Sequence, residues 1–315
     1  MHSVDVIIPT YKPGEKFIKI LDMLKKQTYP VNRIIVVNTE KEYFDNFVSS
    51  GFSMDTYQNV TVHHISKREF DHGGTRRMAV SMSEADFFIC MTDDAVPADE
   101  NVIKELAEAL EKQQVAAAYA RQLPDEHSSE IERFTRAYNY PGESVLKSAA
   151  ELPKLGIKTY FCSNVCAAYR REVYEKLGGF TGHTIFNEDM IYAAGAVKAG
   201  YRIAYVAQAC VYHAHNYTNM QQFRRNFDLG VSQAQHPEIF QGVPSEGEGI
   251  RMVKKTAAHL RETGHRSMIP GLYVTSGYKY IGYQLGKHYQ WLPKRMIRRC
   301  TMNKTYWETE NEPKA

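Results

Sequence analysis

The sequence lacks the features that mark a secreted, disulfide-rich or membrane-embedded protein. Its five cysteines are an odd number scattered along the chain, which argues against a disulfide framework. No apolar stretch reaches the roughly 18 residues that a membrane-spanning helix needs, and the N-terminus has neither the basic nor the apolar segment of a signal peptide. We therefore expect a protein of the reducing cytosol.

An excess of charge of one sign is also missing. The chain has 39 Lys and Arg residues against 36 Asp and Glu residues, so its formal net charge is only +3. Such a balance argues against a dedicated nucleic-acid-binding protein. With 315 residues, 43% of them hydrophobic, the chain can build a sizeable core in one large domain or two small ones.

Two common nucleotide-binding motifs are absent as well. No Gly-x-x-x-x-Gly-Lys-Ser/Thr loop and no Gly-x-Gly-x-x-Gly motif follows the first predicted strand. Any nucleotide must therefore be held by other residues.

The chain does contain apolar runs typical of buried strands, which alternate with apolar residues at helical spacing. In the first 120 residues, strands are expected at 4–8, 33–37, 60–65, 86–91 and 115–120, and helices from residue 17, over 75–84 and around 106–110. This order predicts an α/β fold with a mostly parallel sheet and helices on both of its faces.

The pattern becomes less regular after residue 123. Residues 124–153 are polar and rich in turn formers, which predicts an exposed connection. Farther on, a strand is expected at 158–169, helices at 171–177 and 188–198, strands at 201–206 and 209–213, and helices at 220–234 and over much of 246–290.

Two adjacent carboxylates, Asp93 and Asp94, directly follow one of the buried strands. Open α/β sheets bind their ligands outside the carboxyl ends of the strands, so these acids lie where such a sheet has its chemistry. A divalent cation such as Mg²⁺ prefers one or two carboxylates together with phosphate oxygens and water. The pair therefore suggests a metal that holds a phosphorylated substrate, and the alternative is a solvated turn.

A second acidic segment, Asn187-Glu188-Asp189, opens a predicted helix after a glycine-rich turn. A carboxylate in the first turn of a helix faces the positive end of the helix dipole, which favours its ionised form and lets it accept a proton. The alternative is that Asn187 or Asp189 only caps the helix.

Two further segments have residue types that bind anions or metals. In residues 71–76, a glycine pair before a predicted helix would form a backbone nest for an anion, with Arg76 as a partner for phosphate; the alternative is a flexible turn beside a surface arginine. His213 and His215 follow a strand and would lie on the same side if it continued, so either could complete a metal site. A structural zinc site of Cys162, Cys166 and these histidines competes, although its His-x-His spacing departs from the usual one.

Taken in order, these segments resemble family 2 glycosyltransferases of the GT-A fold, and the chain is most similar to bacterial rhamnosyltransferases. The matching segments lie at residues 6–11, 72–76, 92–97, 163–165 with 177–180, 187–189, and 213–215 with 223–225. We expect a glycosyltransferase domain over 1–240, with a nucleotide-binding half at 1–121 and an acceptor-binding half at 122–240. A helical extension would follow at 241–300 and a polar tail at 301–315.

The resemblance implies an inverting, metal-dependent transferase with Asp189 as the catalytic base. Mg²⁺ or Mn²⁺ would be held by Asp94 with His213 or His215, and the acceptor would contact Asn164 and Glu188. The residues implied in binding the donor nucleotide sugar are Thr10, Tyr11, Asn38, Asp71, Gly74, Arg76 and Asp93. Two positions depart from the family pattern: Asn38 lies where an acid is usual after the second strand, and the metal motif begins with Thr92 instead of Asp.

By the same resemblance, the donor is dTDP-L-rhamnose and the acceptor is a hydroxyl group of a cell-wall, capsular or O-antigen type glycan on a lipid carrier. Three alternatives stay open: a GT-A transferase that uses another UDP- or dTDP-sugar, a nucleotidyltransferase, and a catalytically silent module that binds glycan. A nucleic acid is not an expected partner.

The segment from Trp291 to Arg299 alternates apolar and basic residues. Such a pattern can rest on an anionic membrane, which would place a cytoplasmic enzyme in peripheral contact with the inner face of the cell membrane. The alternative, which we favour, is a helix that packs back on the catalytic domain and leaves a solvated basic face.

Overall fold

The computed structural model describes residues 1–214, 217–243 and 246–309. The chain forms two compact units, each built from separate stretches of sequence. The first contains residues 1–123, 140–182 and 188–213, and the second contains residues 124–139, 183–187 and the chain from residue 214 onward. The structure thus groups residues 214–240 with the helices that follow them, whereas the sequence grouped them with the sheet. The domain boundaries expected at residues 240 and 300 stay predictions.

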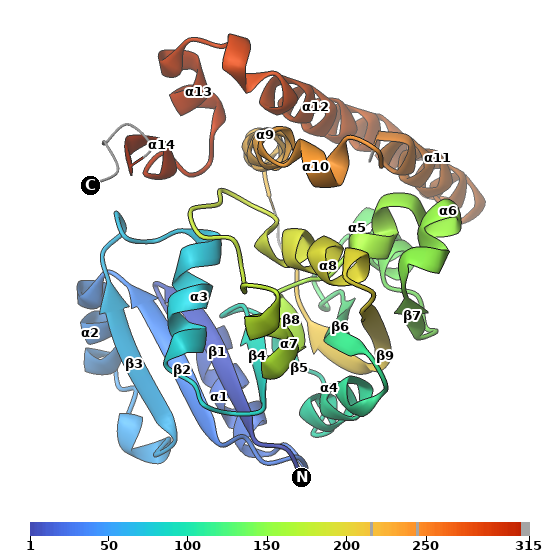
Figure 1. The fold of residues 1–315 in the computed structure, drawn as a ribbon. Helices are drawn as coiled ribbons and strands as arrows, with labels where there is room; N and C mark the ends of the chain where they lie inside the picture. Colours follow the sequence, from blue (N-terminus) through green and yellow to red (C-terminus); the bar gives the residue numbers. More distant parts are fainter. Residues whose placement is uncertain (215–216, 244–245, 310–315) are drawn as a thin grey trace. The chain divides into compact units, whose positions relative to one another are not determined.

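The first unit is organised around a nine-stranded sheet in the order β3-β2-β1-β4-β8-β6-β9-β5, with β7 paired to β9 (Figure 1). Strands β3, β2, β1 and β4 pair in parallel, as do β6 and β9, whereas β8 is antiparallel to β4 and β6. This arrangement confirms the predicted α/β fold. The strands are β1 (Val4–Tyr11), β2 (Arg33–Thr39), β3 (Val60–Ile65), β4 (Phe87–Met91), β5 (Val96–Pro97), β6 (Val115–Leu123), β7 (Val145–Lys147), β8 (Cys166–Arg170) and β9 (Arg202–Tyr212).

Helices cover both faces of this sheet because alternate strand residues point to opposite sides. Val4, Val6 and Ile8 of β1 share one core with apolar residues of α1, α2 and α4. On the other face α3 packs on β1 and β2, and α7 packs on β8. The helices of this unit are α1 (Glu15–Lys25), α2 (Lys41–Ser49), α3 (His72–Ser81), α4 (Val102–Glu111), α6 (Leu152–Leu155), α7 (Arg171–Lys176) and α8 (Glu188–Lys198), with short 3-10 turns η1 (Met54–Thr56), η2 (Ala149–Glu151) and η3 (Gly156–Tyr160).

The structure differs from the sequence prediction in several elements. Residues 124–153 are not simply a connection, because they contain α5 (Glu130–Asn139) and β7. The strand expected at 158–169 is wrong: η3 occupies residues 156–160 and β8 begins only at Cys166. The apolar residues of this stretch are buried in a loop, so their burial did not require a strand. The two strands expected at 201–206 and 209–213 are one strand, β9, with an irregular register against β6.

The second unit is helical. It consists of α5, α9 (Asn219–Gln235), α10 (Pro237–Phe240), α11 (Glu246–Glu262), α12 (Ile269–Lys287), α13 (Lys294–Cys300) and α14 (Tyr306–Thr309), with the 3-10 turns η4 (Arg266–Met268) and η5 (Tyr289–Trp291).

Glycines allow α12 to pack closely on α9. A Cβ atom at Gly282 would lie 2.2 Å from the carbonyl oxygen of Phe223, and one at Gly286 would lie 2.0 Å from that of Phe227. Both positions therefore exclude any larger side chain unless the helices separate.

The C-terminal basic segment does pack back on a neighbouring helix. Ile297 and Cys300 of α13 are buried in a small core with Phe227 and Val231 of α9. Its basic residues remain exposed.

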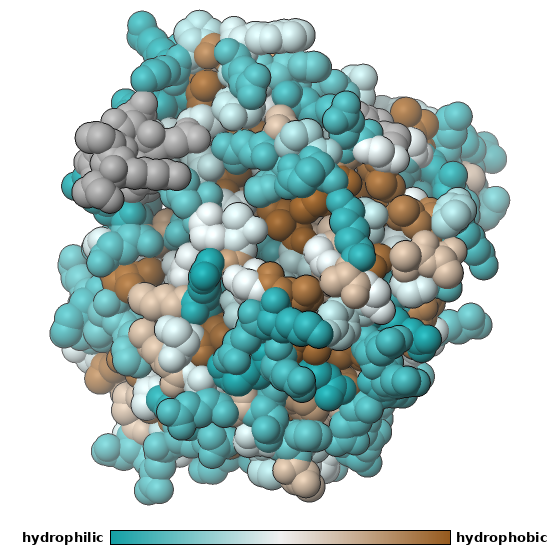
Figure 2. Space-filling model, viewed as in Figure 1, coloured by the Kyte–Doolittle hydropathy of each residue, from teal (hydrophilic) through white to brown (hydrophobic). Residues whose placement is uncertain are grey.

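None of the described helices is long and apolar enough to cross a bilayer. Hydrophilic residues cover most of the face that Figure 2 shows.

Candidate active site

The carboxylate of Asp189 is held by two backbone N–H groups. Asp189 lies in the first turn of α8, a helix that begins directly after Asn187, whose φ of 66° is in the left-handed region. Its Oδ2 accepts a hydrogen bond of 2.8 Å from the backbone N–H of Asn164, and its Oδ1 accepts one of 2.7 Å from that of Met190. The residue keeps part of its surface exposed to solvent. The carboxylate is therefore fixed in orientation and still has lone pairs for a further donor.

Glu188, next to it, is the centre of a buried polar network. The Arg76 guanidinium lies 3.0 Å from Glu188 Oε1, and both side chains are only 6% exposed. The Asn164 amide donates to the same oxygen at 2.9 Å, and Tyr169 donates its hydroxyl proton to Asn164 Oδ1 at 2.7 Å. Asn164 thus binds Glu188 with its side chain and Asp189 with its backbone, so one residue positions both acids.

Their shared environment moves the pKa values of the two acids in opposite directions. For Glu188, burial raises the pKa, but the Arg76 charge and further polar partners outweigh burial and lower it overall. For Asp189, burial and then the neighbouring Glu188 charge raise the pKa to about 7. The helix dipole was expected to keep Asp189 ionised, but burial and this charge prevail. Asp189 is consequently poised to exchange a proton near neutral pH.

Asp94 and His213 form a pair suited to a divalent cation. His213 Nε2 lies 3.5 Å from Asp94 Oδ1, and both residues come from strand ends of the sheet. On the other side of the ring, His213 Nδ1 lies 3.0 Å from Gln122 Oε1, and Gln122 donates its amide to Ser163 Oγ at 3.0 Å. A proton on Nδ1 therefore leaves the Nε2 lone pair facing Asp94. The carboxylate oxygen suits either Mg²⁺ or Mn²⁺, and of these two ions the imidazole nitrogen suits Mn²⁺ better, because Mg²⁺ is the harder cation and prefers oxygen ligands.

The competing zinc site is not supported. Within residues 1–214, 217–243 and 246–309, no three His, Cys, Asp or Glu side chains come together to hold a metal, so Cys162, Cys166 and His213 form no such group. His215, the other predicted metal-binding histidine, lies outside the described residues.

Asp93 connects this edge of the sheet to β1. Its Oδ2 accepts a hydrogen bond of 3.1 Å from the backbone N–H of Tyr11. Burial raises the Asp93 pKa to about 6, although the Arg76 charge opposes the rise. The buried charge of Arg76 opposes the rise in pKa of both Asp93 and Asp189, so it acts on both acidic segments. The charge of Arg76 thus couples the two acidic segments electrostatically.

Thr10 and Asn38, expected to line the nucleotide, are buried and bonded to one another. Thr10 Oγ1 donates to Asn38 Oδ1 at 3.2 Å, while Asn38 Nδ2 bonds the Glu40 carbonyl and His64 Nδ1. These side chains fix the ends of β1 and β2. A direct contact with a nucleotide stays a prediction for both.

The predicted anion nest at residues 71–76 is wrong in its geometry. Gly73 and Gly74 lie inside the first turn of α3 instead of before the helix, and the Gly74 N–H is already bound by Asp71 Oδ1 at 2.6 Å. A Cβ atom at Gly74 would lie 2.3 Å from Asp71 Oδ2, so this glycine makes room for the cap. Arg76 is likewise not a surface residue, because it is buried against Glu188.

Several residues near the site belong to none of the motifs that the sequence contains. Gln122 and Tyr169 orient His213 and Asn164, and neither has a neighbour in the sequence that would indicate this role. Tyr43 meets the exposed ring of Tyr11 edge-on. Lys12 Nζ lies 4.6 Å from the centre of the Tyr43 ring and 5.4 Å from the centre of the Tyr11 ring. This aromatic and basic group adjoins Asp93 through the Tyr11 backbone.

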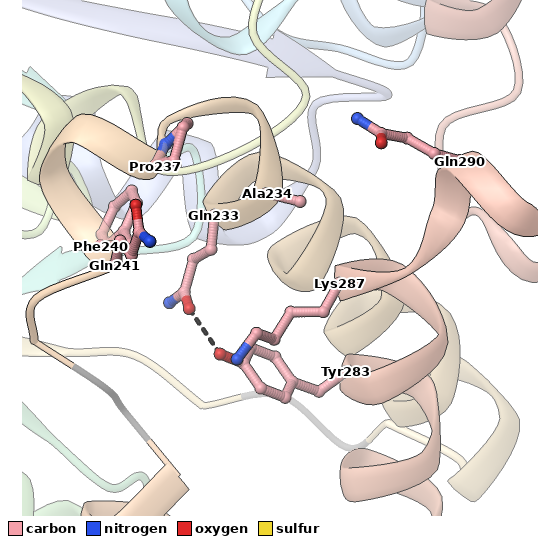
Figure 3. A pocket seen from close by; sticks show the side chains of 8 residues that line it. All are labelled: Gln233, Ala234, Pro237, Phe240, Gln241, Tyr283, Lys287 and Gln290. Carbon is pink, nitrogen blue, oxygen red and sulfur yellow. Dashed lines mark hydrogen bonds between the residues drawn. The ribbon is translucent and has the colours of Figure 1, made fainter.

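A cavity of about 310 Å³ lies in the second unit, and it is lined by residues other than the site residues described above. Figure 3 shows its lining, in which Tyr283 donates a hydrogen bond of 2.6 Å to Gln233. Other lining residues include Phe240, Lys287 and Gln290. None of the sequence-predicted site residues lines it.

Comparisons with known proteins identify a matching family and similar sequences. The family described as "Glycosyl transferase family 2" matches residues 5–178. The "O-antigen chain rhamnosyltransferase RfbN" of Salmonella typhimurium is 41% identical over 309 residues, which cover 97% of this chain and 96% of that protein. The "O-antigen chain rhamnosyltransferase WbaN" of Salmonella anatum is 40% identical over 312 residues, 98% of this chain and 96% of that protein.

A solved structure shares the fold. The "Mannosyltransferase PcManGT from Pyrobaculum calidifontis in complex with GDP-Man and Mn2+" superposes with a TM-score of 0.57 at 15% identity, over 97% of this chain and 84% of that chain. At this identity the likeness concerns the fold alone.

Proposed function

The chain belongs to glycosyltransferase family 2, and we propose that it transfers L-rhamnose from dTDP-L-rhamnose to a hydroxyl group of an O-antigen type glycan, with inversion at the anomeric carbon. The substrate class is inferred from two relatives that are 41% and 40% identical over nearly their whole length and are both named for rhamnosyl transfer in O-antigen chains.

The observation that carries the proposed chemistry is the environment of Asp189. Its carboxylate is fixed by two backbone N–H groups, and its pKa of about 7 suits a general base at neutral pH. In the proposed step, the acceptor hydroxyl gives its proton to Asp189 while the hydroxyl oxygen forms a bond to the anomeric carbon. The bond from that carbon to the diphosphate oxygen breaks, and dTDP leaves with the electron pair.

The other residues of the network position this base. The Arg76 and Glu188 pair, together with Asn164, holds the start of α8 against the loop that precedes β8. We propose that Asn164 and Glu188 border the acceptor site. On the donor side, we propose that Tyr11 and Asp93 contact the nucleotide sugar, and that Asp71 and Gly74 shape the adjacent end of α3.

Asp94 Oδ1 and His213 Nε2 would hold Mg²⁺ or Mn²⁺, which when bound supplies positive charge for the departing diphosphate. Gln122 keeps the His213 imidazole in the orientation that metal binding requires. A lipid-linked acceptor would bring this cytoplasmic enzyme to the inner face of the cell membrane.

The proposal is tested by incubating the purified protein with dTDP-L-rhamnose, Mn²⁺ or Mg²⁺ and a lipid-linked glycan. We expect release of dTDP, a product heavier by one deoxyhexose, and an inverted anomeric configuration by NMR. UDP-sugars and GDP-mannose are the matched controls. Transfer from one of these donors while dTDP-L-rhamnose stays intact would overturn the donor assignment, and release of pyrophosphate would indicate a nucleotidyltransferase instead.

A further inference from the structure

Positive charge is concentrated in one segment near the C-terminus. Between Glu262 and Glu308 the sequence has no acidic residue, but it contains eight Lys and Arg residues. In the rest of the chain, 36 acidic residues exceed the other 31 Lys and Arg residues. The modest net charge of +3 therefore hides a strongly basic segment, which comprises α12, η5, α13 and the loops around them.

The outer face of α12 adds apolar and aromatic groups to this segment. Tyr273, Val274, Tyr280 and Ile281 recur at helical spacing, and each is at least 50% exposed. The opposite face of α12 is the one that packs on α9 through Gly282 and Gly286. We call the four exposed residues the α12 stripe. Tyrosine counts as polar in hydropathy scales but concentrates where a bilayer meets water, so the α12 stripe suits a membrane surface although α12 is not apolar enough to span a bilayer.

Trp291 and α13 continue the surface along the chain. Trp291 is 80% exposed, and its side chain is held in place because it stacks on His288 at 4.7 Å with an interplanar angle of 13°. In α13, Ile297 and Cys300 anchor the helix in the core of the second unit, while Arg295, Arg298 and Arg299 are exposed. A folded, anchored helix thus presents three guanidinium groups a few residues along the chain from an exposed indole.

We propose that the α12 stripe, Trp291 and the three arginines of α13 bind the surface of an anionic phospholipid bilayer directly. The arginines match the negative lipid headgroups, and the stripe and Trp291 match the boundary between headgroups and acyl chains. A second copy of the chain is a poorer occupant, because pairing two such faces would bring two segments with eight cations each together. A soluble polyanion would leave the stripe and the indole uncovered.

This binding would need neither the sugar donor nor the glycan acceptor. It therefore goes beyond recruitment by a lipid-linked substrate, and a failure of the proposed rhamnosyl transfer would leave it unaffected.

The experiment measures binding of the full-length protein to vesicles of phosphatidylcholine, alone or mixed with phosphatidylglycerol. The chain has only two tryptophans, and Trp307 is 93% buried, so a change in tryptophan emission on adding vesicles reports mainly on Trp291. We expect sedimentation and a blue shift with the anionic vesicles only, both reduced by raising the ionic strength. The Trp291→Phe variant should lose the blue shift.

Two sets of variants test the two halves of the surface. R295Q/R298Q/R299Q should weaken binding by at least roughly tenfold, given the attraction of each cation to an anionic surface. The matched control is K16Q/K19Q/K25Q, which removes three exposed charges from α1 and should bind as the unaltered protein does. Y280S/I281S should weaken binding to anionic vesicles. It should also reduce the fraction of this binding that persists at high ionic strength.

Other outcomes overturn the proposal. These are equal binding to neutral vesicles, equal losses in the α1 control and the α13 variant, and unchanged binding of Y280S/I281S. A further contradicting outcome would come from sedimentation equilibrium without lipid. If the protein self-associates and Y280S/I281S abolishes this self-association, the face is a contact between copies of the chain. Circular dichroism of each variant shows whether a loss reflects unfolding. A folded R295Q/R298Q/R299Q or Y280S/I281S protein that binds more weakly than the α1 control supports the proposal.

Discussion

Arg76 Nη1 lies 3.0 Å from Glu188 Oε1 in a setting where both side chains are almost fully buried. The ion pair fixes a negative charge next to Asp189, and that charge helps to raise the Asp189 pKa to about 7. The same guanidinium acts on Asp93 across the site. One buried cation thus acts both on the acid that we propose as the base and on Asp93, which follows β4.

The first prediction concerns the stability of this pair. Arg76→Met leaves the Glu188 carboxylate buried without its cation, and we expect a loss of about 3–5 kcal/mol in the free energy of unfolding. Glu188→Gln should also destabilise the protein. Because each single change leaves one buried group without its partner, the double variant should lose clearly less than the sum of the two. Urea unfolding of all four proteins measures this, and additive losses would contradict a coupled pair.

The second prediction concerns pH. A base with a pKa of about 7 is mostly protonated below that pH, so the transfer rate at saturating substrate should rise with pH and level off above about 7. Glu188→Gln removes the charge that helps to raise the Asp189 pKa, so the rise should move to lower pH in the folded variant. A rate profile that is flat from pH 5 to 9 in the unaltered protein, or a profile that does not move in the variant, would argue against this assignment.

The third prediction concerns the metal. Asp94→Ala and His213→Ala should each abolish tight Mn²⁺ binding, as measured by titration calorimetry without substrate. Gln122→Leu, which removes the acceptor for His213 Nδ1, should weaken binding by about 10–100-fold, the usual effect of losing such a partner. Asp45→Ala, at an exposed position of α2, is the control and should bind as the unaltered protein does. Unchanged affinity in Asp94→Ala would remove the metal site from this place.

The fourth prediction uses three glycines of one helix. Gly282→Ala and Gly286→Ala would place a Cβ atom 2.2 and 2.0 Å from carbonyl oxygens of α9, so each should cost at least roughly 1–3 kcal/mol. At Gly277 no neighbouring atom lies within 4 Å, and alanine should stabilise the helix by about 0.5–1 kcal/mol. Thermal unfolding distinguishes the two cases. Equal effects at all three positions would show that α12 and α9 are not closely packed.

The sequence predicted best the elements whose periodicity is local. The strand at 60–65 and the helix at 188–198 were expected within the bounds that the structure has. Helix α2 was not expected, because only Phe44 and Phe47 of its nine residues are buried and they give too short a pattern. Helix α5 was also missed, because none of its residues is buried and its partner α11 lies more than a hundred residues farther along the chain.

The site shows the same limit. The carboxylates of Asp93, Asp94 and Asp189 could be found in the sequence, because acids at strand ends and helix starts are visible there. The pairing of Arg76 with Glu188 spans more than a hundred residues, so the same arginine was expected to face a phosphate. Asn164 was expected near the acceptor, but its contact with both acids depends on the loop between η3 and β8, where the sequence indicated a strand.

The central claim, that Asp189 is the base of a glycosyl transfer, is tested most directly by the transfer rate of Asp189→Asn. The account predicts a loss of at least roughly 100-fold in this rate, since general base catalysis typically contributes that much, with donor binding and the unfolding transition retained. Thermal shift with dTDP-L-rhamnose and Mn²⁺ checks the binding. A folded Asp189→Asn protein that binds the donor and transfers sugar at the unaltered rate would contradict the account.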